Sequence, residues 1–408
     1  MNGTRRVWRI AFALALSLTT AATRAQPPAG INPQMRYLSE VAANLTGGDA
    51  QKLRETGELD IGAHFDMARL VGIRGGTFQA TISWRRGDNL ARDAGLDTLE
   101  LVQANYGRGQ TARLTQFWYQ QEFLDGRADV KFGRVTAGED FAAFSCDFMN
   151  LGLCGARPGS VVSDYWYNWP ISQWAVRMRY RGPSGYVQVG ALEVNPKNLE
   201  ENFTLGRFSG ATGVLVPFEV AFTPNSAFNQ PLGIYKLGGW YDSSTVDGID
   251  ITGESERLSA LPDLQRQGRY GAYAQIRQQL TGRDNATRTS GLAIFLNIVQ
   301  AEQRTSHLDR QIGFGVTYQP LQHSGAPEEL ALGLTSTRVN PRFASRERQL
   351  HPEEPRLASE YVAEFYGRWN LTPWLWVQPN VQYIVSPGGH SKREDVAIVG
   401  LRLTTALE

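Results

Sequence analysis

Cysteine, lysine and long apolar runs are all scarce in this chain of 408 residues, which holds only two cysteines, five histidines and five lysines. Cys146 and Cys154 lie eight positions apart, and the histidines lie far from both in sequence. A protein metal site needs several such ligands close together. We therefore expect no metal site, and in an exported chain the two cysteines predict a local disulfide.

Apolar runs long enough for a membrane-spanning helix are missing after the first 25 residues. Residues 1–25 combine a positive start at Arg5 and Arg6, an apolar run over 10–18 and a small-residue exit, the pattern of a secretory signal peptide. Residues 26–33 are Pro-rich and predict a flexible leader. Export is therefore expected, and any passage through a membrane would have to be made by strands.

Charge of one sign is not in surplus either, because 41 basic residues face 40 acidic ones. Nucleic-acid-binding domains usually carry a basic excess, so the balance argues against a nucleic-acid partner. All but five of the 41 basic residues are arginine. The planar guanidinium suits ordered hydrogen bonds to oxygen-rich solutes. The arginine-rich codon usage of a GC-rich genome explains the same bias, and both explanations stay open.

Glycine and aromatic residues are plentiful, and a hairpin at 113–135 shows how they are arranged. Gln116 and Trp118 fall on one face of its first strand, and Asp129 and Lys131 share one face of the second. Successive side chains of a strand point to opposite sides, so each strand has an apolar face and a polar face. This pattern suits a strand between lipid and water. A half-buried sheet of a soluble sandwich explains this hairpin equally well.

The same alternation recurs along the chain and predicts sixteen strands of roughly ten residues, an even number, as a transmembrane barrel requires. The fold class is therefore all-β, a transmembrane antiparallel β-barrel of about 16 strands over residues 34–408, with external loops folded into the pore. A soluble β-propeller would show a repeat of roughly 40–50 residues, and none is visible. The predicted strands are 35–45, 58–69, 76–85, 113–123, 128–135, 173–181, 185–193, 212–222, 233–241, 269–279, 291–299, 311–319, 330–338, 360–370, 374–385 and 395–407.

The segment 98–106 could form a further strand or belong to a long loop. In an outer-membrane barrel short turns lie on one side and long loops on the other, in strict alternation. A strand at 98–106 would place the short turns at 71–75 and 124–127 on opposite sides of the membrane. We therefore interpret 98–106 as part of a loop.

Six segments, in this order and spacing, resemble the carbohydrate-selective porin family of the OprB type. The resemblance runs from about residue 36 to the end of the chain and is densest at 111–193 and 360–403. The segments are LTQFWYQQEFLDGRADVKFGRV, AGEDFAAF, PISQWAVRMRY, GIYKLGGWYD, EFYGRWNLTPWLWVQPNVQYIVSPGG and DVAIVGLRL. The resemblance implies a sixteen-stranded outer-membrane barrel for passive diffusion of sugars, glucose-like ones especially. In that family external loops fold inward, and their charged and aromatic side chains contact the sugar.

Strand alternation assigns the faces of such a barrel, because charge facing lipid costs up to about 2–4 kcal/mol at the midplane. Arginine, carboxylate and amide groups can exchange hydrogen bonds with sugar hydroxyls, and aromatic rings can stack on pyranose faces. Charge that merely keeps a wide pore wet is the alternative for any single residue. The predicted pore-lining, substrate-contacting residues are Gln116, Trp118, Lys131, Arg177, Arg179, Lys236, Arg277, Glu364, Arg368, Trp376 and Arg402.

The connection 136–172 is the candidate constriction loop, because it is long, is the third external loop by parity, and carries both cysteines. We hypothesise that Asp147, Arg157 and Asp164 help to form the eyelet. At least one of the loop's rings is expected to contact the pore, and an aromatic girdle at the membrane interface is the alternative. The candidate residues of the constriction loop are Glu139, Asp140, Asp147, Arg157, Asp164, Tyr165, Trp166 and Trp169.

Signatures of an enzyme are missing from the sequence. Adjacent carboxylates such as Glu353 and Glu354 point apart on an extended chain, and no GxSxG, HExxH or phosphate-cradling glycine loop occurs. The sequence predicts a bacterial outer-membrane porin, without catalytic residues or cofactors, for passive diffusion of glucose-like monosaccharides into the periplasm. Its expected partners are small sugars, outer-membrane lipid and the barrel assembly machinery, with the choice between monomer and homo-oligomer open. The alternatives are a general or differently selective porin and, in another class, a soluble exported carbohydrate-binding protein or enzyme.

Overall fold

The computed structural model describes residues 29–200, 203, 209–224, 233–249, 265–281, 284–285, 288–320 and 325–407. The expected signal peptide, residues 1–25, lies outside the described residues, as do residues 26–28 of the expected leader.

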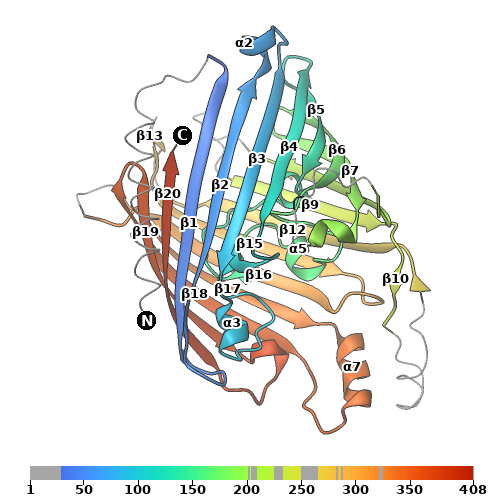
Figure 1. The fold of residues 1–408 in the computed structure, drawn as a ribbon, viewed down its shortest axis with the longest axis vertical. Coiled ribbons are helices and arrows are strands. Elements are labelled where there is room, and N and C mark those ends of the chain that lie inside the picture. Colours follow the sequence, from blue (N-terminus) through green and yellow to red (C-terminus); the bar gives the residue numbers. More distant parts are fainter. Residues whose placement is uncertain are drawn as a thin grey trace.

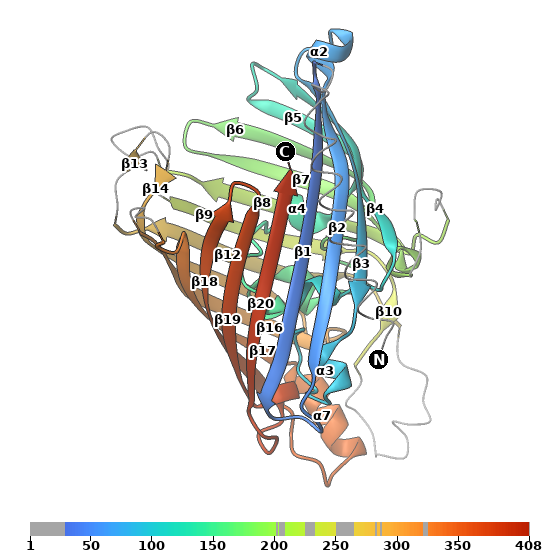
Figure 2. The same ribbon diagram turned by 60° about the vertical axis from the view of Figure 1, so that its left-hand side comes forward.

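Sixteen described strands form one closed antiparallel barrel (Figure 1, Figure 2). Each barrel strand pairs with the next one along the chain, and β1 pairs with β20 to close the ring. The predicted fold class is thereby confirmed. The barrel strands are β1 (Ile31–Thr46), β2 (Leu53–Asp66), β3 (Gly76–Gly87), β4 (Ala112–Phe123), β5 (Ala128–Val135), β6 (Gln173–Gly182), β7 (Gly185–Val194), β8 (Gly213–Phe222), β9 (Gly233–Asp242), β12 (Arg269–Gln279), β15 (Gly291–Ala301), β16 (Leu308–Gln319), β17 (Glu329–Val339), β18 (Ser359–Thr372), β19 (Leu375–Val385) and β20 (Val396–Leu407).

Alternate residues of the barrel strands face opposite sides of the wall, as β8 shows. Leu215 and Glu219 are buried on the inner face, whereas Val216, Phe218 and Val220 are exposed on the outer one. Large apolar side chains are likewise exposed along the other barrel strands, for example on β17 and β18. Because apolar surface of this extent is stable only against lipid or another protein, the outward face is a hydrocarbon-facing belt.

The chain ends of the barrel differ from the sequence-based expectation at β1 and β2. β1 begins at Ile31 and so includes residues 31–33, which were expected to belong to the flexible leader. Those residues are ordered because they pair with β2, for example Pro33 with Ala63. β2 ends at Asp66, whose side chain accepts hydrogen bonds from two backbone N–H groups of the next turn and caps a short helix.

Short turns and long connections gather at opposite ends of the barrel. The turn end carries α2, the start of β1 and the end of β20, and the loop end carries α3 and α7 (Figure 1). Within the described ranges no helix has the length and apolar character needed to cross a membrane. The remaining elements are α2 (Met67–Val71), α3 (Leu90–Asp93), η2 (Ala104–Tyr106), α4 (Ala137–Asp140), η3 (Leu151–Leu153), α5 (Pro158–Val161), η4 (Pro196–Leu199), α7 (Pro341–Leu350), η5 (Pro387–Gly389) and the strand pairs β10 (Val246–Asp247) with β11 (Gln265–Arg266) and β13 (Asp284–Asn285) with β14 (Arg288–Thr289).

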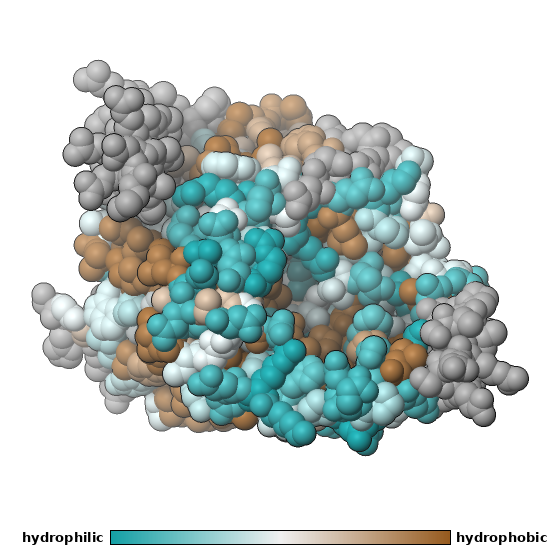
Figure 3. Space-filling model, turned by 60° about the horizontal axis from the view of Figure 1, so that its bottom comes forward, coloured by the Kyte–Doolittle hydropathy of each residue, from teal (hydrophilic) through white to brown (hydrophobic). Residues whose placement is uncertain are grey.

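The segment 98–106 lies in a loop, as the parity argument predicted. It follows α3 and includes η2, and both elements belong to the connection between β3 and β4. Figure 3, which brings the loop end of the molecule forward, shows mainly hydrophilic residues there, with apolar residues at the flanks.

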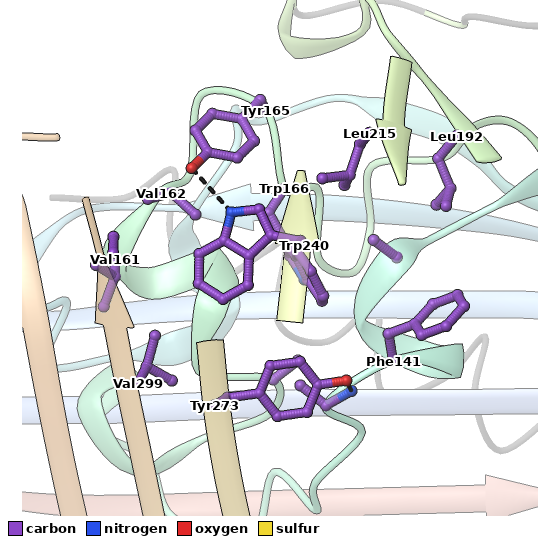
Figure 4. Close-up of a cluster of buried hydrophobic side chains, with 14 of the residues drawn as sticks. Phe141, Val161, Val162, Tyr165, Trp166, Leu192, Leu215, Trp240, Tyr273 and Val299 are labelled. Carbon is purple, nitrogen blue, oxygen red and sulfur yellow. Dashed lines mark hydrogen bonds between the residues drawn. The ribbon is translucent and has the colours of Figure 1, made fainter. Parts of the chain in front are cut away.

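The constriction loop, residues 136–172, folds into the barrel and packs against part of its inner wall. Phe141 and Trp166 from the loop join Trp240 of β9 and Tyr273 of β12 in one buried apolar cluster (Figure 4). A second cluster joins Phe148 of the loop with inward side chains of β15, β17 and β18. The barrel interior is therefore filled on one side by the loop.

Candidate functional site

Carboxylates of the barrel wall hold the backbone of the constriction loop. The two oxygens of Glu364 accept hydrogen bonds from the N–H groups of Met149 and Asn150, each at 2.8 Å. Glu219 accepts one from the N–H of Ala142 at 2.9 Å. Hydrogen bonds to an ionised acceptor are stronger than neutral ones, so these contacts fix the loop at two points of its length.

Basic side chains of the wall hold the loop's carbonyl groups in the same way. Arg402 donates to the carbonyl oxygens of Cys146 and Asp147 at 2.8 Å and of Phe148 at 2.7 Å. Lys236 donates to the carbonyl oxygen of Ala143 at 2.6 Å. Both cations were predicted to face the lumen and do so, but their polar atoms bind the loop.

Ion pairs complete the attachment of the loop to the wall. The Lys131 ammonium lies 3.0 Å from Asp140, and the Arg368 guanidinium lies 2.9 Å from Asp147. The Arg177 guanidinium, which pairs with Asp129 on β5, lies 3.5 Å from Asp140. The predicted lumen-facing cations of β5, β6 and β18 are therefore anchors of the loop.

The predicted disulfide between Cys146 and Cys154 is present. It closes a short segment of the constriction loop whose N-terminal part is held by Arg402. Both cysteines line a cavity inside the barrel.

Asp147, Arg157 and Asp164, which were hypothesised to help form the eyelet, lie outside the lining of this cavity. Asp147 is turned to the wall by Arg368, and Arg157 is buried, donating to the carbonyl oxygen of Leu151 at 2.7 Å. Asp164 pairs with Arg269 at the loop end of β12. All three satisfy partners within the protein, and none of them lines the cavity.

The aromatic cluster of the loop is divided between core and cavity. Tyr165 and Trp166 are buried, and the Tyr165 hydroxyl accepts a hydrogen bond from the indole N–H of Trp240 at 3.0 Å (Figure 4). Trp169 lines the cavity. Of the three rings considered for pore contact, Tyr165, Trp166 and Trp169, only Trp169 is among the residues that line this cavity.

The cavity, of about 680 Å³, runs between the constriction loop and the wall formed by β1–β4 and β20. We call it the passage. Its polar lining includes three members of the predicted site: Gln116, Glu139 and Arg402. The lining residues that carry charge are Arg36, Glu40, Glu58, Asp60, Arg85, Glu139 and Arg402.

Glu58 of β2 is the centre of the polar network in the passage. Its carboxylate accepts hydrogen bonds from the Trp169 indole N–H at 3.2 Å and from Arg36 at 3.0 Å, and it pairs with Arg85. Arg36 also binds Asp60 at 2.7 Å and keeps 45% of its side chain exposed. The passage thus presents an exposed guanidinium next to an indole whose orientation is fixed by a carboxylate.

Glu139 faces the passage from the constriction loop. Its two oxygens accept hydrogen bonds from the Gln116 amide at 2.6 Å and the Thr136 hydroxyl at 2.8 Å. Burial raises the pKa of Glu139, and the nearby Lys131 ammonium opposes that shift. The side chain therefore takes up a proton at a higher pH than an exposed glutamate does.

The remaining predicted lumen residues lie on the inner face at other heights. Trp118 lies under the Lys131 ammonium, which is 4.3 Å from its ring centroid, and Arg179 binds Gln188 at 2.8 Å. Arg277 shares a face of β12 with the buried Gln275 and is exposed. The indole N–H of Trp376 on β19 donates to Glu328 at 3.1 Å.

The predicted site residues did not include Arg36, Glu58, Asp60 and Arg85. The alternation of β2 and β3 places the last three on the polar faces of their strands. That signal could have included them among the lumen residues, but it could not show that the loop leaves this arc of the wall open.

Comparison with known proteins identifies the family. A family model described as carbohydrate-selective porin, OprB family, matches residues 50–407. Porin B of Pseudomonas aeruginosa is 36% identical over 398 residues, covering 92% of this chain and 87% of that protein, and the putative porin QuiX of Acinetobacter baylyi is 32% identical, covering 90% and 87%. The high-pH structure of Pseudomonas putida OprB is 34% identical with a TM-score of 0.87, covering 93% of this chain and 94% of that one. The chain belongs to the carbohydrate-selective porin family, and its barrel is an outer-membrane channel for carbohydrates.

Proposed function

We propose that glucose-like monosaccharides diffuse through the passage and are recognised beside Trp169. The observation that carries this proposal is the contact between the Trp169 indole and Glu58, with Arg36 exposed next to it. A volume of about 680 Å³ is within the roughly 300–1,000 Å³ typical of small-molecule sites.

The chemistry of the passage suits a pyranose. An indole ring can stack on the weakly polar C–H face of the sugar. Arg36, Gln116 and Glu139 offer both donors and acceptors to its hydroxyl groups. Each of these side chains already has a hydrogen-bond partner within the protein. A sugar would therefore replace existing hydrogen bonds with new ones and be bound weakly. Weak binding is what conduction requires.

Both signs of charge line the passage, and this favours solutes without net charge. Three cationic and four anionic side chains face it: Arg36, Arg85 and Arg402 against Glu40, Glu58, Asp60 and Glu139. An anionic solute of similar size would meet the carboxylates without a surplus of cations to compensate them. We therefore expect neutral sugars to pass faster than sugar acids.

Liposome swelling tests the proposed selectivity. Proteoliposomes would be diluted into isotonic glucose, a disaccharide, or a neutral amino acid, and the initial swelling rates compared. Glucose is expected to enter fastest. Equal rates for glucose and an amino acid of comparable size would show a general porin and reject recognition at Trp169.

We further propose that residues 1–25 are a cleaved export signal and that the barrel assembly machinery inserts the chain into the outer membrane. Outer-membrane lipid would then cover the apolar outward faces of the strands. N-terminal sequencing of the protein from isolated outer membranes is expected to begin near Gln26. A mature protein that keeps Arg5 and Arg6 would contradict the proposal.

A further inference from the structure

Trp376 repeats, at another place in the lumen, the arrangement found at Trp169. It lies on the same face of β19 as the buried Gln378 and Asn380 and is itself half-buried. Its indole N–H donates to the Glu328 carboxylate at 3.1 Å. The corresponding distance between Trp169 and Glu58 is 3.2 Å. In both cases a carboxylate holds the N–H edge of an indole ring, which belongs to the constriction loop at Trp169 and to the wall at Trp376.

Polar groups surround Trp376 as they surround Trp169. Asn370, its register partner on β18, is exposed. Arg368, two residues before Asn370 and on the same face, donates to Gln378 at 2.9 Å and keeps 22% of its side chain exposed. The Asn370 amide and the part of the Arg368 guanidinium that the constriction loop leaves exposed therefore lie next to the ring, with the Glu328 carboxylate at its N–H edge.

The strand register connects Trp376 to the passage. Four residues occupy one row across four neighbouring strands, namely Glu58, Leu38, Thr404 and Trp376. Neighbouring strands are about 4.8 Å apart, so three steps place the backbone of Trp376 about 14 Å from that of Glu58. Arg402 and Ala406, the inward residues on either side of Thr404, both line the passage. The row thus runs from the passage directly to Trp376.

Trp376 also lies toward the turn end of the barrel. It is the second residue of β19, directly after the short turn that follows Thr372. In outer-membrane barrels the short turns face the periplasm. A solute that leaves the passage toward the periplasm therefore reaches this ring on its way out.

We propose that Trp376, with Glu328, Arg368 and Asn370, forms a second carbohydrate-binding station at the periplasmic exit. This proposal depends on the proposed function, since it requires a sugar in the passage. The backbone of Trp376 lies about 14 Å from that of Glu58, the partner of Trp169, so the sugar transfers from one ring to the other. Two weak stations in series keep the sugar hydrogen-bonded over a longer path than one strong site would.

Sugar block of ion current in planar bilayers tests the second station. Glucose would be titrated against the open-channel current of the wild type and of Trp376→Ala. Loss of one stacking partner is expected to raise the half-blocking glucose concentration by about threefold to tenfold, with the sugar-free conductance little changed. Trp376→Phe, which keeps a ring without the N–H, is expected to fall between the two.

Trp369→Ala is the matched control, because Trp369 is a half-buried indole on β18 next to the same row but on the opposite face. Glucose is expected to block the current of this variant at the same concentration as that of the wild type. If Trp376→Ala fails to give a heat-modifiable barrel, Trp376→Leu keeps apolar volume without a ring and serves in its place. If glucose blocks Trp376→Ala (or Trp376→Leu) as strongly as the wild type but blocks Trp169→Ala more weakly, the second station is rejected and the proposed function is retained. Absence of any glucose block in the wild type would reject both.

Discussion

At the level of single residues, the carboxylate of Glu58 organises the passage. It binds three donors from three segments, Trp169, Arg36 and Arg85, although it is only 2% exposed. A buried carboxylate is stable only when it is paired in this way. The indole of Trp169 is thereby held at the passage at the expense of conformational freedom, and recognition of a flat sugar face requires such a fixed ring.

Trp169→Ala is expected to weaken recognition without closing the channel. Loss of one stacking ring is worth about 1 kcal/mol, so the half-blocking glucose concentration should rise about fivefold. Ion conductance should not fall, since side-chain volume is removed. The measurement is glucose block of the ion current. Trp84→Ala, which truncates an indole on the outward face of β3, is the control. Its current should be blocked by glucose at the same concentration as that of the wild type.

Glu139 predicts a pH dependence of ion selectivity. Because burial raises its pKa, with Lys131 opposing, Glu139 becomes neutral at a higher pH than the roughly 4.3 of an ordinary glutamate. Acidification from neutral pH should therefore reduce the preference for cations in a step that begins before exposed carboxylates titrate. Reversal potentials in a salt gradient would show this step.

In Glu139→Gln that step should be missing, and the cation preference at neutral pH should already be lower. Gln keeps an acceptor for the Gln116 amide, so the position of the loop is preserved. A variant with the same pH profile as the wild type would contradict the assignment of the step to Glu139.

Strand periodicity predicted which residues face inward, but not which inward residues meet water. Lys131, Glu364 and Arg368 lie on the inner face as expected, yet each binds the constriction loop. Asp60 and Arg36 have the same periodic signal and line the passage. The difference depends on where a loop distant in sequence settles, and local alternation carries no information about that.

At the level of elements, the constriction loop forms a separate layer that is bound to the barrel wall by hydrogen bonds and ion pairs. Its length, its position after the fifth strand and its disulfide were predicted from the sequence. Its course was not: of the charged residues expected to help form an eyelet, Arg157 binds carbonyl groups of the loop itself and Asp164 binds Arg269, and neither lines the passage. Buried polar groups must find partners, and the buried Arg269 guanidinium finds one in Asp164, 105 positions away in the chain.

Arg402→Met is expected to release the loop. Arg402 binds three loop carbonyl groups and Glu40, so its loss leaves a buried carboxylate without its partner. Breaking one side of a buried pair costs about 3–5 kcal/mol. The variant should unfold at a lower temperature, seen in its heat-modifiable mobility, and its current should fluctuate. Arg277→Met, an exposed inward arginine of β12, should do neither.

Removal of the disulfide should have a smaller effect. Cys146→Ser with Cys154→Ser opens a closed segment of eight positions, worth at most about 2–3 kcal/mol by loop-closure entropy. Arg402 still holds the carbonyl groups at 146–148, so conductance and glucose block should stay close to the wild type. A large rise in conductance would show that the disulfide, rather than the wall contacts, keeps the loop in place.

At the level of the whole molecule, the sequence predicted the barrel almost completely. All sixteen predicted strands are present. They could be predicted because each strand faces lipid on one side and the lumen on the other, so that apolar and polar residues alternate along it. The asymmetric filling of the lumen was not predictable in this way. It follows from apolar loop residues such as Phe141 and Trp166 packing on β9 and β12.

A charge on the outward belt should destabilise the barrel, whereas the lumen tolerates charge. Leu332 is exposed on β17 between the apolar neighbours Val316 and Phe365. Leu332→Arg is expected to cost about 2–4 kcal/mol if it lies near the membrane midplane. Folding into lipid vesicles, followed by the mobility shift on heating, measures the loss. Folding as efficient as that of the wild type would mean that this face does not contact hydrocarbon.

The pair formed by Glu40 and Arg402 joins β1 to β20, residues 362 positions apart in the chain, and the same arginine holds the constriction loop. One wall of the passage is therefore the seam at which the first and last strands meet. A chain whose seam is still open has neither this wall nor the anchor for its loop. During biogenesis the selective channel would therefore form only when β1 pairs with β20. A partly inserted protein would either conduct solutes without selectivity or stay closed, and in neither state would it discriminate between sugars.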